Sequence, residues 1–276
     1  PPGLDPGKSI EGAIFLKEHG IDMINIADGP RAIARMGPRT MAGLVHEATG
    51  IVPITHYCCR DRNILAMQMD LIGAHATGFT NLMLITGDPP KMGNAPHATA
   101  VFDLDSVGLI TMVDRMNQGI DISGRFLGGR TRHVLGTGCN PGSVDLDREV
   151  KHFENKVRAG AEFVFSQPVY DPELLETFLK RTEYIEPKIP FFVGILPLAS
   201  YKNAEFLTAN VPGMEVPQDV RDRLRLAGTK EKEREEGVKI AQEALRHAKS
   251  FSRVKGAYIF PPFGNYKAVL RVLEGA

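Results

Sequence analysis

Short apolar segments alternate with longer amphipathic segments along the whole chain. The apolar segments are rich in β-branched and aromatic residues and end in glycine, proline or polar residues, as strands do. We expect strands at residues 22–27, 51–57, 81–86, 133–138, 162–167, 191–196 and 254–260. We expect helices at residues 8–19, 30–49, 63–77, 106–117, 146–159, 172–182, 202–209, 218–226, 228–251 and 266–273. This alternation predicts a parallel sheet covered by helices.

Two parallel folds suit a chain of 276 residues: an eight-stranded (β/α)8 TIM barrel and an open doubly wound sheet. No GxGxxG sequence opens the first units, which favours the barrel. The pattern contains seven strands and starts with a helix, so we expect the first strand of the barrel to lie upstream of Pro1. Pro1-Pro2 would be the turn that leaves it. No internal linker marks a second domain, so residues 1–276 are expected to form one domain of a longer chain.

The charge balance narrows the class of partner. Lys+Arg and Asp+Glu number 33 each, so the net charge is zero, which argues against a nucleic-acid binder. No apolar run approaches the roughly 20 residues that span a bilayer, and the N-terminal residues lack a signal-peptide core. Three cysteines make no disulfide framework. We therefore expect a cytoplasmic protein with no membrane association.

The sequence NLMLITGDPPKMG, residues 81–93, places one carboxylate in a stiff setting. Residues 81–86 read as a buried strand, and Gly87 and the prolines 89 and 90 end it abruptly. Asp88 is either a turn aspartate that bonds its own backbone or an anionic group held toward the axis of the barrel. The sequence alone leaves both interpretations open.

Two further strand ends carry polar residues. Residues 55–60, THYCCR, suggest a metal, but ligands that alternate in direction along one strand do not converge, so we expect no metal site. Arg60 and Arg62 are alternatively placed to reach phosphate groups. Residues 136–142, GTGCNPG, resemble a glycine-rich loop that cradles phosphate, although one glycine cluster is weak evidence.

Glu149, His152 and Lys156 lie three and four residues apart and share one face of a predicted helix. An exposed, salt-bridged face is the simpler interpretation of this spacing. The charged run at residues 230–236 is interpreted as the solvated face of a long helix.

The segments HYCCRDRN, LITGDPPKMG, KVRAGAEFVFSQPVYD and GILPL resemble methylenetetrahydrofolate reductase, in the order and spacing of that family. The resemblance covers essentially the whole chain. It is greatest to the reductase half of bifunctional bacterial proteins, which carry a homocysteine methyltransferase domain ahead of it. It implies a flavin-binding TIM barrel that uses FAD and NAD(P)H to reduce methylenetetrahydrofolate, and a homo-oligomer. A fused upstream methyltransferase domain is a further expectation.

The resemblance also assigns residues. Asp88 matches the family aspartate that lies near flavin and folate and tunes both. The positions that match FAD contacts are Thr55, Thr86, Gly87, Asp88, Gly136, Thr137, His152 and Lys156. The positions that match the substrate side are Gln167, Leu196 and Tyr258, with Phe260 beside them. On this interpretation His152 and Lys156 reach the ribose and diphosphate of FAD.

The chain departs from the family at three places. Thr86 stands where many relatives have arginine, and Gly138 replaces a tyrosine. The general-acid glutamate of the family lies on the strand expected upstream of Pro1, so this segment would lack it. Two other functions stay open: a flavin-free pterin-binding methyltransferase barrel and a non-catalytic folate-binding subunit.

Overall fold

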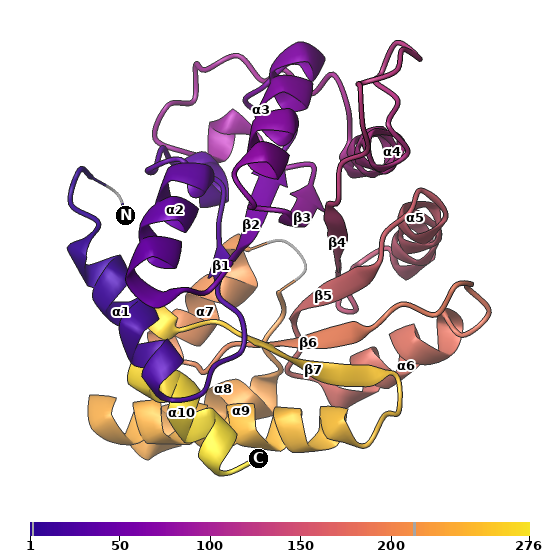
Figure 1. The fold of residues 1–276 in the computed structure, drawn as a ribbon. Helices are drawn as coiled ribbons and strands as arrows, with labels where there is room; N and C mark the ends of the chain where they lie inside the picture. Colours follow the sequence, from indigo (N-terminus) through magenta and orange to yellow (C-terminus); the bar gives the residue numbers. More distant parts are fainter. Residues whose placement is uncertain (2, 212–213) are drawn as a thin grey trace. The chain divides into compact units, whose positions relative to one another are not determined.

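The computed structural model describes residues 1, 3–211 and 214–276 (Figure 1). Pro2, half of the expected Pro1-Pro2 turn, lies outside the described residues. Contacts divide the chain into two compact units. The first unit is Pro1–Thr137 with Arg158–Glu162, and the second is Gly138–Val157 with Phe163–Ala276.

The first unit contains a parallel arrangement of strands with helices packed on them. Its elements are α1 (Gly7–Glu18), β1 (Asn25–Ile26), η1 (Pro30–Ala32), α2 (Pro38–Thr49), β2 (Ile54–Cys58), α3 (Ile64–Ala76), β3 (Asn81–Ile85), η2 (Pro90–Met92), α4 (Ser106–Asn117) and β4 (Val134–Cys139), whose last two residues belong to the second unit. Strands β1, β2, β3 and β4 pair in parallel in that order. Helix α2 packs on β1 and β2, and α4 packs on β3. The burial of Met41 and Val45 on α2 supplies part of the apolar driving force.

The second unit repeats this arrangement. Its elements are α5 (Leu146–Arg158), β5 (Phe163–Pro168), α6 (Pro172–Arg181), β6 (Phe191–Ile195), α7 (Tyr201–Asn210), α8 (Gln218–Ala227), α9 (Lys230–Lys249), β7 (Val254–Ile259), η3 (Pro262–Gly264) and α10 (Tyr266–Glu274). Strands β5, β6 and β7 are parallel neighbours. The long helix α9 runs beside β6 and β7 (Figure 1). It also packs against α6, α8 and α10, so it is the central helix of this unit.

The strand order equals the chain order, β1-β2-β3-β4-β5-β6-β7. Parallel strands in chain order, joined by helices, are the arrangement of an α/β barrel and differ from a doubly wound sheet, in which the order reverses. The prediction of the TIM-barrel class is confirmed. The seven predicted strands all form, and ten α-helices are found in the described residues.

The helix predicted at residues 30–49 is wrong in its first part. Residues Pro30–Ala32 form a single 3-10 turn, and the helix begins only at Pro38. Arg31 and Ala32 have left-handed φ angles of 57° and 54°. Because Pro38 disfavours a helical conformation for the residue before it, Gly37 is extended, with ψ 138°, and separates the turn from the helix.

The glycine-rich segment at residues 136–142 forms the end of the strand expected at residues 133–138, and the interpretation of the whole segment as a phosphate-binding loop is wrong. Gly136, Thr137 and Gly138 lie inside strand β4. Gly136 pairs with Met83 and Thr137 with Leu84 of β3. These glycines are therefore ladder residues, and only the turn after Cys139 is a loop.

Strands β5 to β7 have two distinct faces. Phe191 of β6 contacts Phe178 of α6, with ring centroids 6.2 Å apart, so it faces the helices. Its neighbour Phe192 contacts Phe163 and Phe165 of β5 on the opposite face. Successive side chains of a strand point to opposite faces, so Phe191 lies on the face that the helices cover and Phe192 lies on the other face.

Among the helices of the described residues, none has the length and apolar character needed to cross a membrane.

Candidate functional site

Asp88 follows β3 and lies between two conformationally restricted segments. Gly87 has a φ of 95°, a backbone conformation that is unfavourable for residues with a side chain. Pro89 and Pro90 restrict the backbone after Asp88. The backbone N–H of Arg31 donates a hydrogen bond of 2.7 Å to Oδ2 of Asp88. Within the part of the chain that the structure describes, Oδ1 makes no protein hydrogen bond, so one oxygen orients the half-buried carboxylate and the other remains to accept from a ligand.

The threonines predicted at the FAD site fall into two groups. Thr55 and Thr137 are buried, at 3% and 0% exposure, and their hydroxyls bond the backbone carbonyls of Asn81 and Leu84. Thr86 is half-buried, and its Oγ1 accepts a hydrogen bond of 3.1 Å from the N–H of Ser106. Because the Thr86 hydroxyl acts as an acceptor there, its hydrogen stays available to a ligand. Of the three threonines, Thr86 presents a polar atom beside Asp88.

Arg60 and Arg62 point into the protein, contrary to the idea that both reach phosphates. The Arg60 side chain is 5% exposed. Its Nη1 donates to the carbonyl oxygens of Gly29 (3.3 Å) and Asp88 (3.2 Å). Arg62 Nη1 pairs with Asp28 Oδ2 at 2.8 Å. The sequence carries no signal for these contacts, because they join loops that follow three different strands.

The structure brings three potential metal ligands, Asp28, Cys58 and Asp61, within 4.8 Å of one another. Both carboxylates already accept hydrogen bonds from guanidinium groups, Asp28 from Arg62 and Asp61 from Arg60. Burial raises the pKa of the Cys58 thiol to about 12, so the sulfur is protonated near neutral pH as long as no metal is bound. The neighbouring positive charges and the protonated thiol both disfavour a cation at this cluster.

In the second unit, the shared face of α5 turns toward the end of β4. Nζ of Lys156 donates a hydrogen bond of 2.8 Å to the carbonyl oxygen of Gly138, and Oε1 of Glu149 accepts one of 2.9 Å from the N–H of Asn140. Lys156 is 6% exposed, and burial raises the pKa of Glu149. The interpretation of this face as a solvated salt-bridge surface is therefore wrong for Lys156, while His152 is half-buried.

A register shift at the end of β5 presents Gln167. Phe165 pairs with Phe192 and Pro168 pairs with Gly194, so β5 has one more residue than β6 across this interval. Ser166 turns inward, and its Oγ accepts a hydrogen bond of 2.8 Å from the N–H of Gly194. Gln167 is exposed as a result. Such bulges often redirect a side chain beside a functional site.

Tyr258 belongs to an aromatic cluster on the face of β5–β7 opposite the helices. Its ring stacks on Phe165, with centroids 4.7 Å apart and an interplanar angle of 30°, and lies 4.2 Å from Phe260. Phe192 lies 5.3 Å from Phe165. Phe165 and Phe192 were not among the residues predicted from the sequence. The alternation FVF in β5 and the doublet FF in β6 were the available signals.

Leu196, also predicted on the substrate side, contacts the helices of the second unit. It is half-buried and packs against the apolar cluster formed by α7, α8 and α9, and its carbonyl oxygen accepts a hydrogen bond of 3.1 Å from the Tyr170 hydroxyl. In this structure Leu196 supports the helices beside β6.

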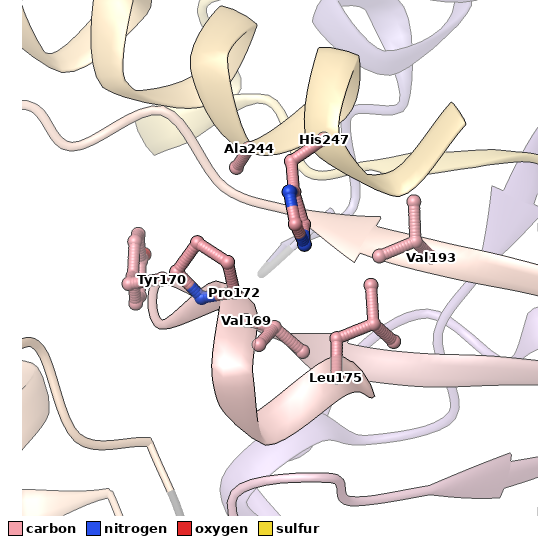
Figure 2. Close-up of a pocket in the computed structure, with 7 residues that line it drawn as sticks. All are labelled: Val169, Tyr170, Pro172, Leu175, Val193, Ala244 and His247. Carbon is pink, nitrogen blue, oxygen red and sulfur yellow. The ribbon is translucent and has the colours of Figure 1, made fainter. Parts of the chain in front are cut away.

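A small recess lies on the helix side of the second unit (Figure 2). Figure 2 shows His247 and Ala244 of α9 facing Val169, Pro172 and Leu175 across it. Tyr170 and Val193 complete its lining. Its volume of about 230 Å³, solvent included, is below the 300–1,000 Å³ typical of small-molecule sites. None of the predicted site residues lines it.

The fold and these strand ends define an α/β-barrel protein with polar and aromatic groups where its parallel strands end. The chain belongs to the methylenetetrahydrofolate reductase family, whose model matches residues 12–261. Among curated proteins it is 26% identical over 194 residues to methylenetetrahydrofolate reductase 1 of Schizosaccharomyces pombe, covering 69% of this chain and 30% of that protein. It is 23% identical over 185 residues to a probable methylenetetrahydrofolate reductase (NADPH) of Caenorhabditis elegans, covering 67% of this chain and 26% of that protein. The chain thus spans less than a third of the length of these relatives.

Among solved structures, the fold is similar to that of an uncharacterized protein from Clostridium thermocellum, described as binding two copies of 5-methyl-5,6,7,8-tetrahydrofolic acid. The TM-score is 0.68 at 13% identity, covering 97% of this chain and 88% of that one. At this identity the similarity establishes the fold alone.

Proposed function

We propose that the chain is the reductase part of an enzyme that converts 5,10-methylenetetrahydrofolate to 5-methyltetrahydrofolate, with FAD as cofactor and NADH or NADPH as electron donor. The observation that carries the proposal is the fixed carboxylate of Asp88 at the end of β3, in a chain that belongs to the reductase family. A homo-oligomer, an upstream methyltransferase domain and a cytoplasmic location remain predictions.

The residues at the strand ends fit FAD in the chemistry they offer. Thr86 has a hydroxyl hydrogen to donate, Gly87 lets a ring approach the backbone closely, and Asp88 has an oxygen to accept. Lys156 and His152 of α5 supply positive charge and hydrogen-bond donors of the kind that a diphosphate and a ribose require. Thr55, Gly136 and Thr137 would act through the strands that they hold in register. FAD, when bound, carries the two electrons from NAD(P)H to the folate.

Asp88 has two tasks in this proposal. Its carboxylate accepts a hydrogen bond from the pterin and stabilises the positive charge that develops when the folate imidazolidine ring opens to an iminium. The same negative charge disfavours further electron density on the cofactor and so lowers its reduction potential. Both effects require a fixed direction, since Coulomb energy in a partly dry site falls with distance.

Gln167 and Tyr258 are proposed to bind the folate. The exposed amide of Gln167 can donate to and accept from a pterin edge at once. The stacked rings of Phe165 and Tyr258 offer an apolar, flat surface on which an aromatic ring can pack. We assign Leu196 a supporting role, because its contacts are with the helix cluster.

A second candidate function is a folate-binding protein that catalyses no reduction. It is favoured by the similarity to the Clostridium thermocellum protein, whose description mentions bound 5-methyltetrahydrofolic acid. The presence of Thr86 in place of arginine is compatible with it. A flavin-free methyltransferase has no comparable support.

The absorption spectrum of the purified full-length protein tests the proposal. A bound flavin spectrum, together with NAD(P)H oxidation by a quinone acceptor and by methylenetetrahydrofolate, is the expected result. A colourless protein that binds folate would favour the second candidate. A yellow protein that oxidises NAD(P)H with the quinone but leaves folate unchanged would contradict the proposed substrate.

A further inference from the structure

We propose that Arg60 is a positioning residue that holds the Asp88 carboxylate in place by fastening the loops after β1 and β3 to the end of β2. The proposal rests on the proposed function for its catalytic consequence, because it concerns how Asp88 is directed at a substrate. The contacts themselves are independent of any reaction.

The Arg60 guanidinium reaches the backbone on both sides of the Arg31–Asp88 hydrogen bond. Nη1 donates to the carbonyl oxygen of Gly29, two residues before Arg31, and to the carbonyl oxygen of Asp88 itself. The remaining nitrogens, Nε and Nη2, each donate a hydrogen bond of 2.7 Å to one oxygen of Asp61. All three nitrogens are thus committed, and the planar fork has one orientation.

The backbone of Arg60 adds a further link. Its carbonyl oxygen accepts a hydrogen bond of 2.9 Å from the N–H of Val101, in the long segment between β3 and α4. The same residue therefore holds the start of the β3 loop through its side chain and the later part through its main chain. The Arg60 side chain therefore binds the backbone of Gly29 and of Asp88, and the Arg60 carbonyl oxygen binds the backbone of Val101.

Glycines make room for this side chain in both loops. A Cβ on Gly29 would lie 2.7 Å from Nη2 of Arg60, and a Cβ on Gly87 would lie 3.3 Å from Cβ of Arg60 and 2.9 Å from Cβ of Cys58. Both glycines have positive φ angles, of 51° and 95°. Two loops that are far apart in sequence are thus shaped to approach the same arginine.

The chemistry favours arginine over lysine here. A guanidinium can serve a carboxylate with two parallel hydrogen bonds and still direct a third nitrogen to two carbonyl oxygens. An ammonium is a point charge on a flexible stem and cannot hold this set in one plane. The hydrogen bonds from Arg60 lower the pKa of Asp61, so the pair stays charged and the anchor persists across the physiological range.

Arg60→Met and Arg60→Lys in the full-length, FAD-loaded protein test the inference by two measurements. Hydrogen exchange at the Arg31 amide, which is bonded to Asp88, should become about tenfold faster in Arg60→Met, because its acceptor is no longer fixed. The folate half-reaction should slow by about tenfold or more, since small displacements of a directing group are costly. Reduction by NAD(P)H should change much less, and Arg60→Lys should not restore either property.

The matched control is Arg62→Lys, at a half-buried arginine two residues away that pairs with Asp28 and, in the described part of the chain, makes no hydrogen bond to Gly29 or Asp88. It should alter stability while leaving both measurements near the wild-type values. If Arg60→Met does not fold, Asp61→Asn loosens the same fork and should shift both measurements in the same direction.

The inference is overturned if exchange at Arg31 in Arg60→Met equals that of the control, or if the two half-reactions slow equally. If the wild-type protein reduces no folate, the proposed function fails, and exchange at the Arg31 amide still decides whether Arg60 positions Asp88.

Discussion

The backbone nitrogen of Arg31 lies 2.7 Å from Oδ2 of Asp88, although the two residues are 57 positions apart in the chain. Arg31 has a left-handed φ of 57°, a conformation that is unfavourable for a residue with a side chain. Strained residues of this kind persist where surrounding contacts hold them, and they cluster at functional sites. Asp88 therefore has both a structural and a proposed chemical role, and the two can be separated by substitution.

We expect Asp88→Asn to keep the fold and the flavin, because the asparagine Oδ1 can still accept from Arg31. The flavin potential should rise, since a negative charge is lost. The folate half-reaction should slow at least tenfold, about 1.4 kcal/mol of barrier, while reduction by NAD(P)H changes much less. Stopped-flow measurement of each half-reaction provides the test. Asp103→Asn is the control, because Asp103 likewise accepts one backbone N–H, from Ile64. Equal slowing of both half-reactions would reduce Asp88 to a turn residue.

We expect the double variant His152→Ala, Lys156→Ala to lose flavin on dialysis while remaining folded. Removing Lys156 leaves the Gly138 carbonyl oxygen without the hydrogen bond recorded from Nζ, which should lower the free energy of unfolding by about 1–3 kcal/mol. Visible absorbance after dialysis and urea unfolding measure the two effects. Lys151→Ala is the control on the same helix, since Lys151 is 62% exposed and pairs with Glu154. A double variant that stays fully yellow would show that this face does not hold FAD.

We expect Tyr258→Leu to raise the KM for methylenetetrahydrofolate by about tenfold, because the stacked pair with Phe165 is lost. The KM for NAD(P)H with a quinone acceptor should respond less if the ring serves the folate. Steady-state kinetics with both acceptors measures this difference. Tyr184→Leu, at a tyrosine that is 62% exposed, should change neither value. Unchanged folate kinetics in Tyr258→Leu would remove the aromatic cluster from the proposed site.

Two helical glycines should respond in opposite directions to alanine. Gly237 lies in α9, and a Cβ there would overlap the carbonyl oxygen of Leu198. Gly43 lies in α2 with nothing within 4 Å of the position of a Cβ. Alanine favours a helix over glycine by about 1 kcal/mol, so Gly43→Ala should stabilise. Gly237→Ala should destabilise, because the steric overlap outweighs propensity. Urea midpoints compare them, and stabilisation by Gly237→Ala would contradict the close packing of α9.

Acid should destabilise the fold through His133. Its side chain is 3% exposed, Nε2 lies 3.1 Å from the carbonyl oxygen of Leu71, and burial lowers its pKa from 6.5 to about 4. Between these values the unfolded chain binds more protons than the folded one, so stability falls as pH drops from 6.5 to 4 and changes no further below. The full loss from this group is about 3 kcal/mol. His133→Gln should flatten urea stability against pH in this window, whereas His19→Gln, at an exposed histidine, should not.

Much of the fold could be predicted from periodicity alone. The helix expected at residues 106–117 forms as Ser106–Asn117, because an aspartate N-cap, Asp105, precedes a regular apolar stripe. The helix expected at residues 30–49 failed at its start because local turn chemistry at Pro30 and Pro38 overrode the pattern. Gly136 and Gly138 fit the strand expected at residues 133–138 and contradict the phosphate-binding loop, since they lie in β4, where Gly136 pairs with Met83.

The site was less accessible from sequence. Asp88 stood out because its own neighbours constrain it. The contacts of Arg60 could not be predicted in this way, since its partners Gly29 and Asp88 come from loops that meet only in the folded chain. Lys156 was assigned through family resemblance, whereas its bond to Gly138 depends on how α5 packs on the end of β4. Local pattern predicts elements, and contacts between loops require the tertiary structure.

The register between β6 and β7 shifts by one residue where the two strands pair. Phe191 pairs with Val254 and Phe192 with Gly256, so Lys255 is an additional residue in β7. Every residue after it is displaced by one step relative to the pleat, which places Tyr258 on the same face as Phe192. In a regular strand, Tyr258 would share the face of Val254, four residues before it, and would point away from Phe192. The number of residues in β7, and not the identity of the side chains beside the shift, therefore determines which face of the sheet receives the Tyr258 ring.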